Sequence, residues 1–254
     1  MSTDRDQGRL KAVDRVEASI QASANDRNRD SQIKGMREAQ LLSPAALDEM
    51  KIVHPAMRNR KVLNTFRDLR TKLIYEGGRE NFVLLVSSVC PQGGGSFVAR
   101  NLAAAFALDQ MKTALLIDCN LYEPSVHELF GIDAELGLTD YLADDSIDLD
   151  EIIYASGVQR LRVIPAGNHC ESGTEHFTSV RMKKLMAEVV RRYPDRYIVL
   201  DAPSVAASAD TRILVELCEL SLLVVPYGKV MEAEVASGVE TLSLTKFAGV
   251  VFNN

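Results

Sequence analysis

The sequence lacks the features that mark secreted proteins, membrane spans and disulfide or zinc scaffolds. Its four cysteines are widely scattered and form no C-x-x-C pair, as is usual for reduced thiols. Asp4, Arg5 and Asp6 stand where a signal peptide would need apolar residues. No stretch approaches the roughly 20 apolar residues of a membrane span. We therefore expect a cytoplasmic protein that is recruited to the inner membrane face only through a partner.

An excess of positive charge is also missing. The formal net charge is −6 and the pI is near 5.3, so general binding to nucleic acid is not expected. The hydrophobic share of 46% is ordinary for a globular protein, and 254 residues suffice for one large domain with extensions.

The first part of the chain has the composition of a segment that does not fold by itself. Residues 1–40 are rich in Asp, Arg, Asn, Gln and Ser and cannot bury enough apolar surface to fold alone. Apolar residues recur at helical spacing within Arg9–Ala22, which indicates an amphipathic helix, either solvated or docked on a partner. Ser43 and Pro44 predict the start of a short helix. We assign residues 1–58 to a flexible, partly helical arm and 59–254 to the main domain.

A glycine-rich turn organises the main domain. The apolar run that starts at Phe82 leads into VCPQGGGS, and a helical pattern follows from Phe97. A buried strand, a glycine-rich turn and a helix N-terminus together present backbone N–H groups to a phosphate. Taken alone, the glycines could also mark only a tight turn. The residues predicted to contact a nucleotide are Gly93, Gly94, Gly95, Ser96 and Phe97.

One residue of the phosphate-binding pattern is missing. The pattern G-x-x-x-x-G-K-[ST] has a lysine where this chain has Gly95. That lysine brings positive charge to the β and γ phosphates. A hydrogen bond to a charged group contributes roughly 1.5–3 kcal/mol, so its loss should weaken nucleotide binding about tenfold or more. Lys112 and Lys229 are the candidates to replace it in space.

The rest of the chain alternates between apolar strands and helices. This alternation predicts an α/β fold with a parallel sheet covered by helices on both faces, and ligands at the carboxyl ends of its strands. Residues 166–178 are predicted to be an irregular loop. The strands after the first are predicted at Thr113–Asp118, Leu161–Pro165, Tyr197–Asp201, Ser221–Val225 and Gly249–Asn253. The longer helices are predicted at Asn59–Tyr75, Phe97–Gln110, Ser179–Tyr193, Asp210–Leu217 and Glu232–Leu244.

Two of the predicted strands end in an aspartate, Asp118 and Asp201. In P-loop NTPases the loop hydroxyl and a strand-end aspartate hold Mg²⁺, and a further carboxylate orients the attacking group. We assign Mg²⁺ to Ser96, Asp118 and Asp201, with Asp201 at the Walker B position and Asp118 as a base or an indirect contact that reaches the metal through one of its ligands. A single aspartate at a strand end could equally be a turn former.

Several segments resemble, in order, those of the bacterial tyrosine kinases (BY-kinases), deviant P-loop ATPases that govern capsule and exopolysaccharide assembly. SSVCPQGGGSFVARNLAAAFA resembles their Walker A loop and helix, LLIDCNLYEPSVHELFG their second acidic motif, and YIVLDAPSV their Walker B strand. NTFRDLRTKL resembles the E-x-x-R-x-x-R helix through which those domains pack into rings. The resemblance implies a P-loop NTPase-like sheet, ATP or ADP with Mg²⁺, and a homo-oligomer interface at Arg67 and Arg70. It also implies a membrane polysaccharide co-polymerase, the chain-length regulator, as partner.

The departures from the family pattern concern its chemistry. Besides Gly95, Asn120 replaces the second aspartate of the D-x-D-x-R motif, Tyr122 its arginine, and Asn64 the glutamate of the ring-forming helix. The family's tyrosine cluster after the last strand has no counterpart up to Asn254, so we expect no autophosphorylation there. These changes predict a pseudokinase with a degenerate Walker A loop that regulates exopolysaccharide polymerisation and export.

Two alternatives stay open at this point, and with them the question of whether the chain is an enzyme. One is an active ATPase or tyrosine kinase that acts on a partner. The other is a partitioning-type ATPase, which is less favoured because such proteins carry a signature lysine early in the loop, where this chain has Pro91 and Gln92.

Overall fold

The computed structural model describes residues 41–78, 81–168 and 173–254. The chain divides into two units, residues 1–37 and 38–254, and every described residue belongs to the second. The predicted helix at Arg9–Ala22 lies outside the described residues.

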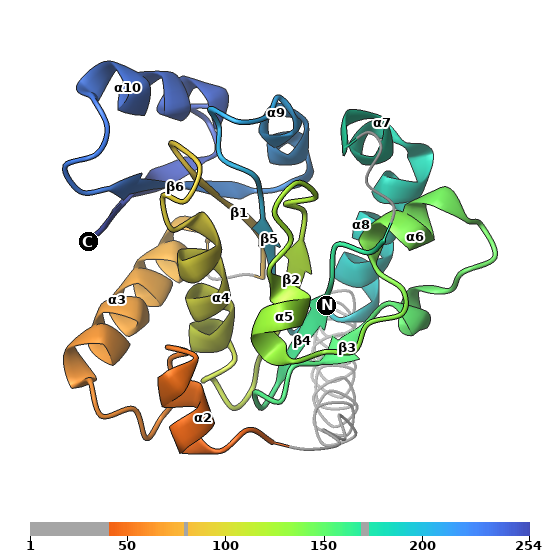
Figure 1. Cartoon of the computed structure of the whole chain (residues 1–254), viewed down its shortest axis with the longest axis horizontal. Coiled ribbons are helices and arrows are strands. Elements are labelled where there is room, and N and C mark those ends of the chain that lie inside the picture. Colours follow the sequence, from red (N-terminus) through yellow and green to blue (C-terminus); the bar gives the residue numbers. More distant parts are fainter. Residues whose placement is uncertain (1–40, 79–80, 169–172) are drawn as a thin grey trace, which may run out of the picture. The chain divides into compact units, whose positions relative to one another are not determined.

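Seven strands form one sheet in the order β3-β4-β2-β5-β1-β6-β7 (Figure 1). All neighbouring strands pair in parallel except the short β3, which is antiparallel to β4. The predicted parallel sheet is confirmed, and β3 was not predicted. The strands are β1 (Val83–Ser88), β2 (Thr113–Asp118), β3 (Tyr154–Ala155), β4 (Leu161–Ile164), β5 (Arg196–Asp201), β6 (Leu220–Pro226) and β7 (Phe247–Asn253).

Helices cover both faces of the sheet and divide the core in two. On one face α4 packs against β1, β2 and β5, and α3 packs on α4. The second core cluster lies on the other face, with α6 to α10. The helices are α2 (Pro44–Glu49), α3 (Arg60–Glu76), α4 (Gly95–Phe106), α5 (Val126–Phe130), α6 (Leu138–Ala143), α7 (Gly173–Thr178), α8 (Val180–Arg192), α9 (Asp210–Leu214) and α10 (Glu232–Thr241), with 3₁₀ turns at Leu149–Glu151 and Val215–Leu217.

Helix α7 stands where the sequence predicted only irregular loop. It has six residues, too few to show a helical period. Phe177 anchors it in the core with 1% of its surface exposed. The Thr174 hydroxyl also donates to Asp210 Oδ1 at 2.7 Å, which ties α7 to α9.

Residues 41–58 pack as part of the sheet-bearing unit, which starts before the predicted boundary at residue 59. Ile52 and Val53 are fully buried in the core. Asn101 of α4 holds this segment, because its Oδ1 accepts from the Val53 N–H at 2.8 Å and its Nδ2 donates to the Lys51 carbonyl at 3.0 Å. The short helix predicted from Ser43 and Pro44 is present as α2, whereas the packing of residues 51–53 on α4 has no periodic signal in the sequence.

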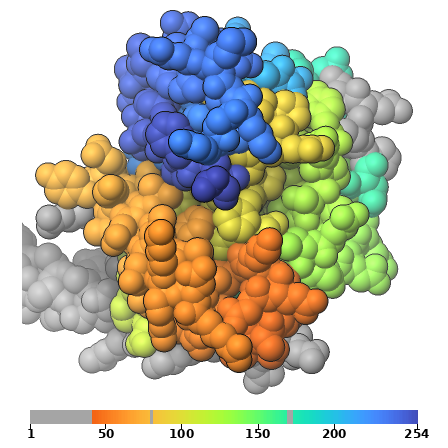
Figure 2. Space-filling model, turned by 60° about the vertical axis from the view of Figure 1, so that its left-hand side comes forward, coloured from red at the N-terminus to blue at the C-terminus, as the bar shows by residue number. Residues whose placement is uncertain are grey.

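Helix α3 forms as predicted. Asn59 caps its first turn by accepting from the Val62 N–H, and Leu63, Phe66 and Leu73 are buried. Figure 2 shows α3 on the surface of this face, with the dark-blue end of β7 beside the yellow start of α4.

Candidate functional site

The carboxyl ends of β2, β5 and β1 lie side by side and bring the predicted site residues together. Asp118 and Asp201 are direct partners in the register of β2 and β5, and Asp201 is also the partner of Val86 on β1. The loop after β1 therefore opens beside both aspartates. Ser96 lies near Asp201, where its hydroxyl favours the ionised form of that carboxyl and so lowers its pKa.

The glycine-rich loop has a backbone that side chains would not allow. Gly94 has a φ of 92°, and a Cβ added there would lie 2.0 Å from Asn253 Nδ2. The Gly93 N–H donates to the Cys90 carbonyl at 3.1 Å, which closes the turn. Gly94 caps α4 without a side chain, so the amides of the first helical turn stay open to an anion.

A cavity of 640 Å³ opens between this loop, the segment after β2 and the segment after β5. Of the residues that line it, all within the described ranges, Glu123 is the only charged one, and none is lysine or arginine. Lys112 cannot substitute for the missing lysine, because its Nζ donates to Asn81 at the other end of the strands. Lys229 is exposed and does not line the cavity. The lining residues are Ser88, Pro91–Phe97, Asn120, Tyr122–Ser125, Ala202–Ser204 and Ala207.

Asp118 is fully buried, and backbone donors occupy both of its oxygens. Oδ1 accepts from the Asn120 N–H at 3.1 Å, and Oδ2 accepts from the Ser125 and Val126 N–H groups at 3.0 and 3.1 Å. Burial raises the pKa of Asp118 to about 6, opposed by these hydrogen bonds and by His127. The carboxylate thus organises the segment from β2 to α5. Its role as a base stays a prediction.

Asp201 is buried with an oxygen that lacks a partner. Burial raises the pKa of Asp201 well above its usual value, and the neighbouring Asp118 charge raises it further, against the Ser96 hydroxyl and the Arg100 charge. Its Oδ1 has no hydrogen-bond partner among the described residues. A divalent cation would supply that partner, because carboxylate and hydroxyl oxygens suit Mg²⁺. These residues therefore fit a metal site.

Relatives of known class share most of this chain, although no protein-family model matches it. The tyrosine-protein kinase YwqD of Bacillus subtilis (strain 168) is 32% identical over 203 residues, which cover 78% of this chain and 84% of that protein. This chain belongs to the bacterial tyrosine kinase family. The tyrosine-protein kinase CpsD of Streptococcus agalactiae (strain NEM316) is 29% identical over 211 residues, or 82% of this chain and 89% of that protein.

Solved structures agree with the BY-kinase assignment. The kinase domain of the Escherichia coli tyrosine kinase ETK superposes with a TM-score of 0.73 at 26% identity, covering 87% of this chain and 83% of that chain. The cell division ATPase MinD of Pyrococcus furiosus has a TM-score of 0.55 at 19% identity, over 67% and 70% of the two chains. The likeness to MinD concerns the fold alone. The predicted P-loop NTPase-like fold is confirmed.

Sequence reasoning missed Arg100 of this BY-kinase, whose charge acts on Asp201. Its charge favours the ionised form of Asp201, while burial lowers the pKa of Arg100 itself. Its guanidinium lies 5.1 Å from the centre of the Phe97 ring, and its Nε is buried without a partner among the described residues. The available signal was its spacing, one helical turn after Ser96.

Tyr122 stands where the family motif has its arginine, and it forms a polar contact in the cleft. Its hydroxyl donates to Asp210 Oδ2 at 3.0 Å, and Asp210 is 1% exposed. Asp210, at the start of α9, was not predicted as part of this region. Nothing in the sequence links two residues 88 positions apart.

Helix α3 matches the ring-forming helix of the BY-kinases, and its two arginines differ in their contacts. Arg70 Nη1 donates to the Ala105 carbonyl of α4 at 2.9 Å, so this side chain contacts its own chain. Arg67 and Arg70 are both partly exposed. Their role at an oligomer interface stays a prediction.

Proposed function

We propose that this BY-kinase is a pseudokinase-like regulator of exopolysaccharide or capsule polymerisation and export, with weakened nucleotide binding. One observation carries the proposal: no lysine or arginine is among the described residues that line the cavity beside the glycine-rich loop. In P-loop enzymes a cation at this place stabilises the charge that develops on the transferred phosphoryl group. Without it, binding can persist while catalysis is lost.

The cofactors that we propose are ATP or ADP with Mg²⁺. The open amides of the first turn of α4 would hold a phosphate, and Ser96 with Asp201 would hold the metal. The metal, when bound, neutralises part of the phosphate charge. Asp118 would act through the backbone of the β2–α5 segment, since its oxygens already accept three N–H donors.

The partner that we propose is a membrane polysaccharide co-polymerase, which would recruit the chain to the cytoplasmic face of the inner membrane. No helix among the described residues is long and apolar enough to cross a membrane. In the tyrosine-protein kinase wzc of Salmonella typhimurium, the region that matches 84% of this chain is 28% of that protein. A kinase-like region joined to a longer chain in one relative supports association with a separate protein here. We also propose a homo-oligomer through α3, with Arg67 as the more available arginine.

Calorimetric titration with MgATP tests the nucleotide part of the proposal. We expect weak binding and no release of phosphate over hours. Tight binding accompanied by turnover would contradict the pseudokinase proposal, and the nearby Arg100 charge would then be the first candidate for the compensating cation.

The alternative is an active kinase that phosphorylates a partner, and Arg100 is the observation that favours it. Its test is transfer of radiolabel from ATP to a tyrosine-containing cytoplasmic segment of the co-polymerase. Transfer that is abolished in both Asp118→Ala and Asp201→Ala would establish this activity.

A further inference from the structure

The two outermost strands of the sheet differ in how much backbone they leave open. On one side β3 has only two residues, and on the other β7 has seven (Figure 1). A long outermost strand presents a row of unpaired N–H and C=O groups, and monomeric proteins usually protect it with charged side chains or proline. The strand Phe247–Asn253 contains neither. Among the described residues β7 pairs only with β6, so its outer side is open.

The outer side of β7 exposes the backbone of two residues. The Asn253 carbonyl accepts from the Tyr227 N–H, directly after β6, at 2.8 Å, so the backbone of Asn253 bonds toward β6. The residues of a strand bond alternately to its two sides. Val251 therefore also bonds toward β6, whereas the N–H and C=O groups of Val250 and Phe252 point away from it. In the described part of the chain, these two residues have no hydrogen bond outside the sheet.

The side chains of the same two residues are apolar and exposed. Val250 has 36% of its surface exposed, and Phe252 has 70%. Because side chains alternate along a strand, both lie on one face of the sheet, while Val251 packs on the other face against the core cluster that contains α3 and α4. Tyr227, beside the end of β7, adds another exposed ring. Open backbone groups and exposed apolar side chains thus coincide.

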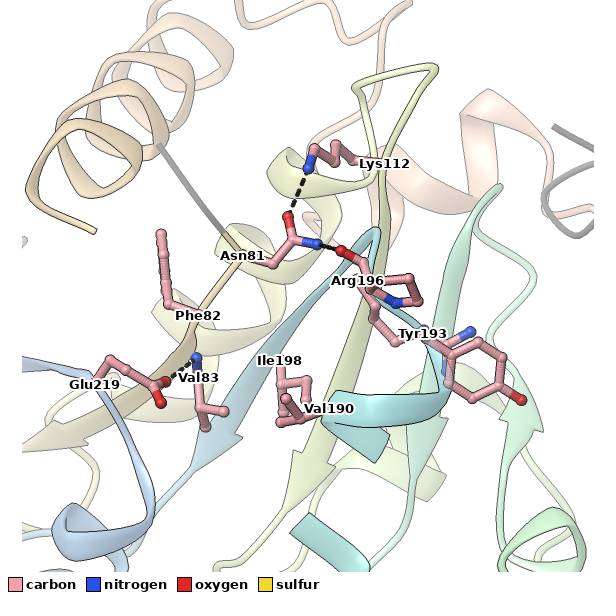
Figure 3. Close-up of a pocket in the computed structure, with 10 residues that line it drawn as sticks. Asn81, Phe82, Val83, Lys112, Val190, Tyr193, Arg196, Ile198 and Glu219 are labelled. Carbon is pink, nitrogen blue, oxygen red and sulfur yellow. Dashed lines mark hydrogen bonds between the residues drawn. The ribbon is translucent and has the colours of Figure 1, made fainter. Parts of the chain in front are cut away.

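Backbone groups at the amino ends of the strands are satisfied by contrast. A cavity of 420 Å³ lies there, where β1 and β5 begin and α8 ends (Figure 3). The Val83 N–H donates to Glu219 Oε2 at 2.7 Å, and the Pro194 carbonyl accepts from the Asn81 amide. Side chains of the chain itself occupy these groups. The outward groups of β7 have no such partner among the described residues.

We propose that β7 pairs edge to edge with β7 of a second copy of this chain, antiparallel, so that the two sheets become one. In the pairing centred on Val251, Val250 of one copy lies opposite Phe252 of the other. Two-fold symmetry makes this contact occur twice. Each such pair exchanges two backbone hydrogen bonds, and a β-branched residue opposite an aromatic one is a favourable cross-strand pair.

Charge and order favour a second copy over a flexible segment of another protein. Each chain has a net charge of −6, but no charged residue lies within β7, so two copies of this strand meet without direct repulsion. A strand that is already formed also loses less conformational entropy on pairing than a flexible segment does. The contact is far smaller than the roughly 1,600 Å² of a standard stable interface. We therefore expect a weak, reversible dimer, distinct from the interface proposed for α3.

Sedimentation velocity of the full chain tests this dimer. The sedimentation coefficient should rise from that of a 28.0 kDa monomer toward that of a dimer as the protein concentration increases. Phe252→Lys should raise the dissociation constant about tenfold or more, because it removes the exposed ring and puts a positive charge on both copies of the strand. Val180→Lys, at a position of α8 that is 71% exposed, is the matched control and should dimerise like the unchanged chain.

Amide hydrogen exchange of the unchanged chain locates the contact and does not depend on the folding of a variant. The Val250 and Phe252 amides should exchange fast in dilute protein and severalfold more slowly in concentrated protein. The Val251 amide, which bonds toward β6, should be slow in both. A monomer at every concentration would overturn the proposal, as would a dimer in which the Val250 and Phe252 amides stay unprotected. A dimer that is lost in Arg67→Ala but kept in Phe252→Lys would also overturn it, because the contact would then lie at α3.

Discussion

The two ends of the parallel sheet carry opposite chemistry. At the carboxyl ends, the open amides of α4 lie beside two buried aspartates, and no described lysine or arginine lines the cavity. At the amino ends, Arg196 and Lys112 line a cavity close to the end of α8. Helix dipoles favour this division, because cations are stabilised near helix C-termini and anions near N-termini. The difference teaches that the backbone geometry suited to a phosphate is present at the carboxyl ends without a described lysine or arginine in the cavity beside it.

Adding a cation at the carboxyl edge, where the strands end beside the glycine-rich loop, should produce the largest change in nucleotide affinity. Gly95→Lys should strengthen MgATP binding about tenfold or more, since it restores a charged hydrogen bond to the phosphates. Gly95 is the first residue of α4, and a Cβ there would lie 3.2 Å from the Ser88 nitrogen, so only a small shift is needed. Calorimetry measures the change.

The neutral variant Gly95→Met is the control for that experiment, because it adds similar bulk without charge. It should bind MgATP no better than the unchanged chain. Equal gains in both variants would show that shape, and not charge, limits binding at this edge.

The paired aspartates should make stability depend on pH. Their pKa values are raised in the folded chain, so the folded state holds protons that the unfolded state releases. For Asp118 the stabilisation is complete below about pH 4 and is lost as the pH rises through about 6. The raised pKa of Asp201 extends the loss to higher pH. Urea unfolding in EDTA should therefore show a falling free energy of unfolding across this range.

Removing one charge of the pair sharpens this prediction. Asp201→Asn should flatten the pH dependence and raise the free energy of unfolding at pH 8 by on the order of 1 kcal/mol or more. Asp133→Asn, at an exposed position, should leave the curve unchanged. A flat profile for the unchanged chain would contradict the coupling of the two carboxyls.

Tyr122→Phe should have a smaller effect, confined to the carboxyl edge. It removes the hydroxyl that donates to the buried Asp210, so we expect a loss of about 1 kcal/mol in the free energy of unfolding. Tyr227→Phe is the matched control, because Tyr227 is 71% exposed. Urea unfolding of both variants gives the comparison, and equal losses would rule out the specific contact.

Lys229→Gln should have the smallest effect. Lys229 belongs to the carboxyl edge but does not line its cavity. We expect MgATP affinity to be unchanged in calorimetry. A severalfold loss would mean that this exposed lysine reaches the phosphates and that the two edges differ less than proposed.

The carboxyl edge was predictable from sequence because its pieces are local patterns. Continuous apolar runs that end in Asp118 and Asp201, and three glycines before a helix, follow from parallel-sheet rules without knowledge of tertiary contacts. The adjacency of the two aspartates in the register then follows from strand order, which the pattern does not reveal by itself.

The amino edge, where the strands begin, could not be predicted in the same way. Arg196 and Lys112 are ordinary surface-type residues in sequence, and Arg196 is buried through tertiary contacts that include the Tyr193 ring and Thr113. The packing of Lys51 and Val53 on α4 was not predicted for a similar reason, since Asn101 holds them through two side-chain hydrogen bonds that no spacing indicates. Helix α7 was too short for its period to be seen.

The contact between Asn253 and the glycine-rich loop links the cleft to the margin of the sheet. Asn253 Nδ2 donates to the Gly93 carbonyl at 3.3 Å from β7, the outermost strand. If a protein added a strand to β7 and moved this side chain, it would also change a contact of the turn around Gly94. Whatever is bound in the cleft would then alter the affinity for that added strand by the same factor, since such coupling is reciprocal.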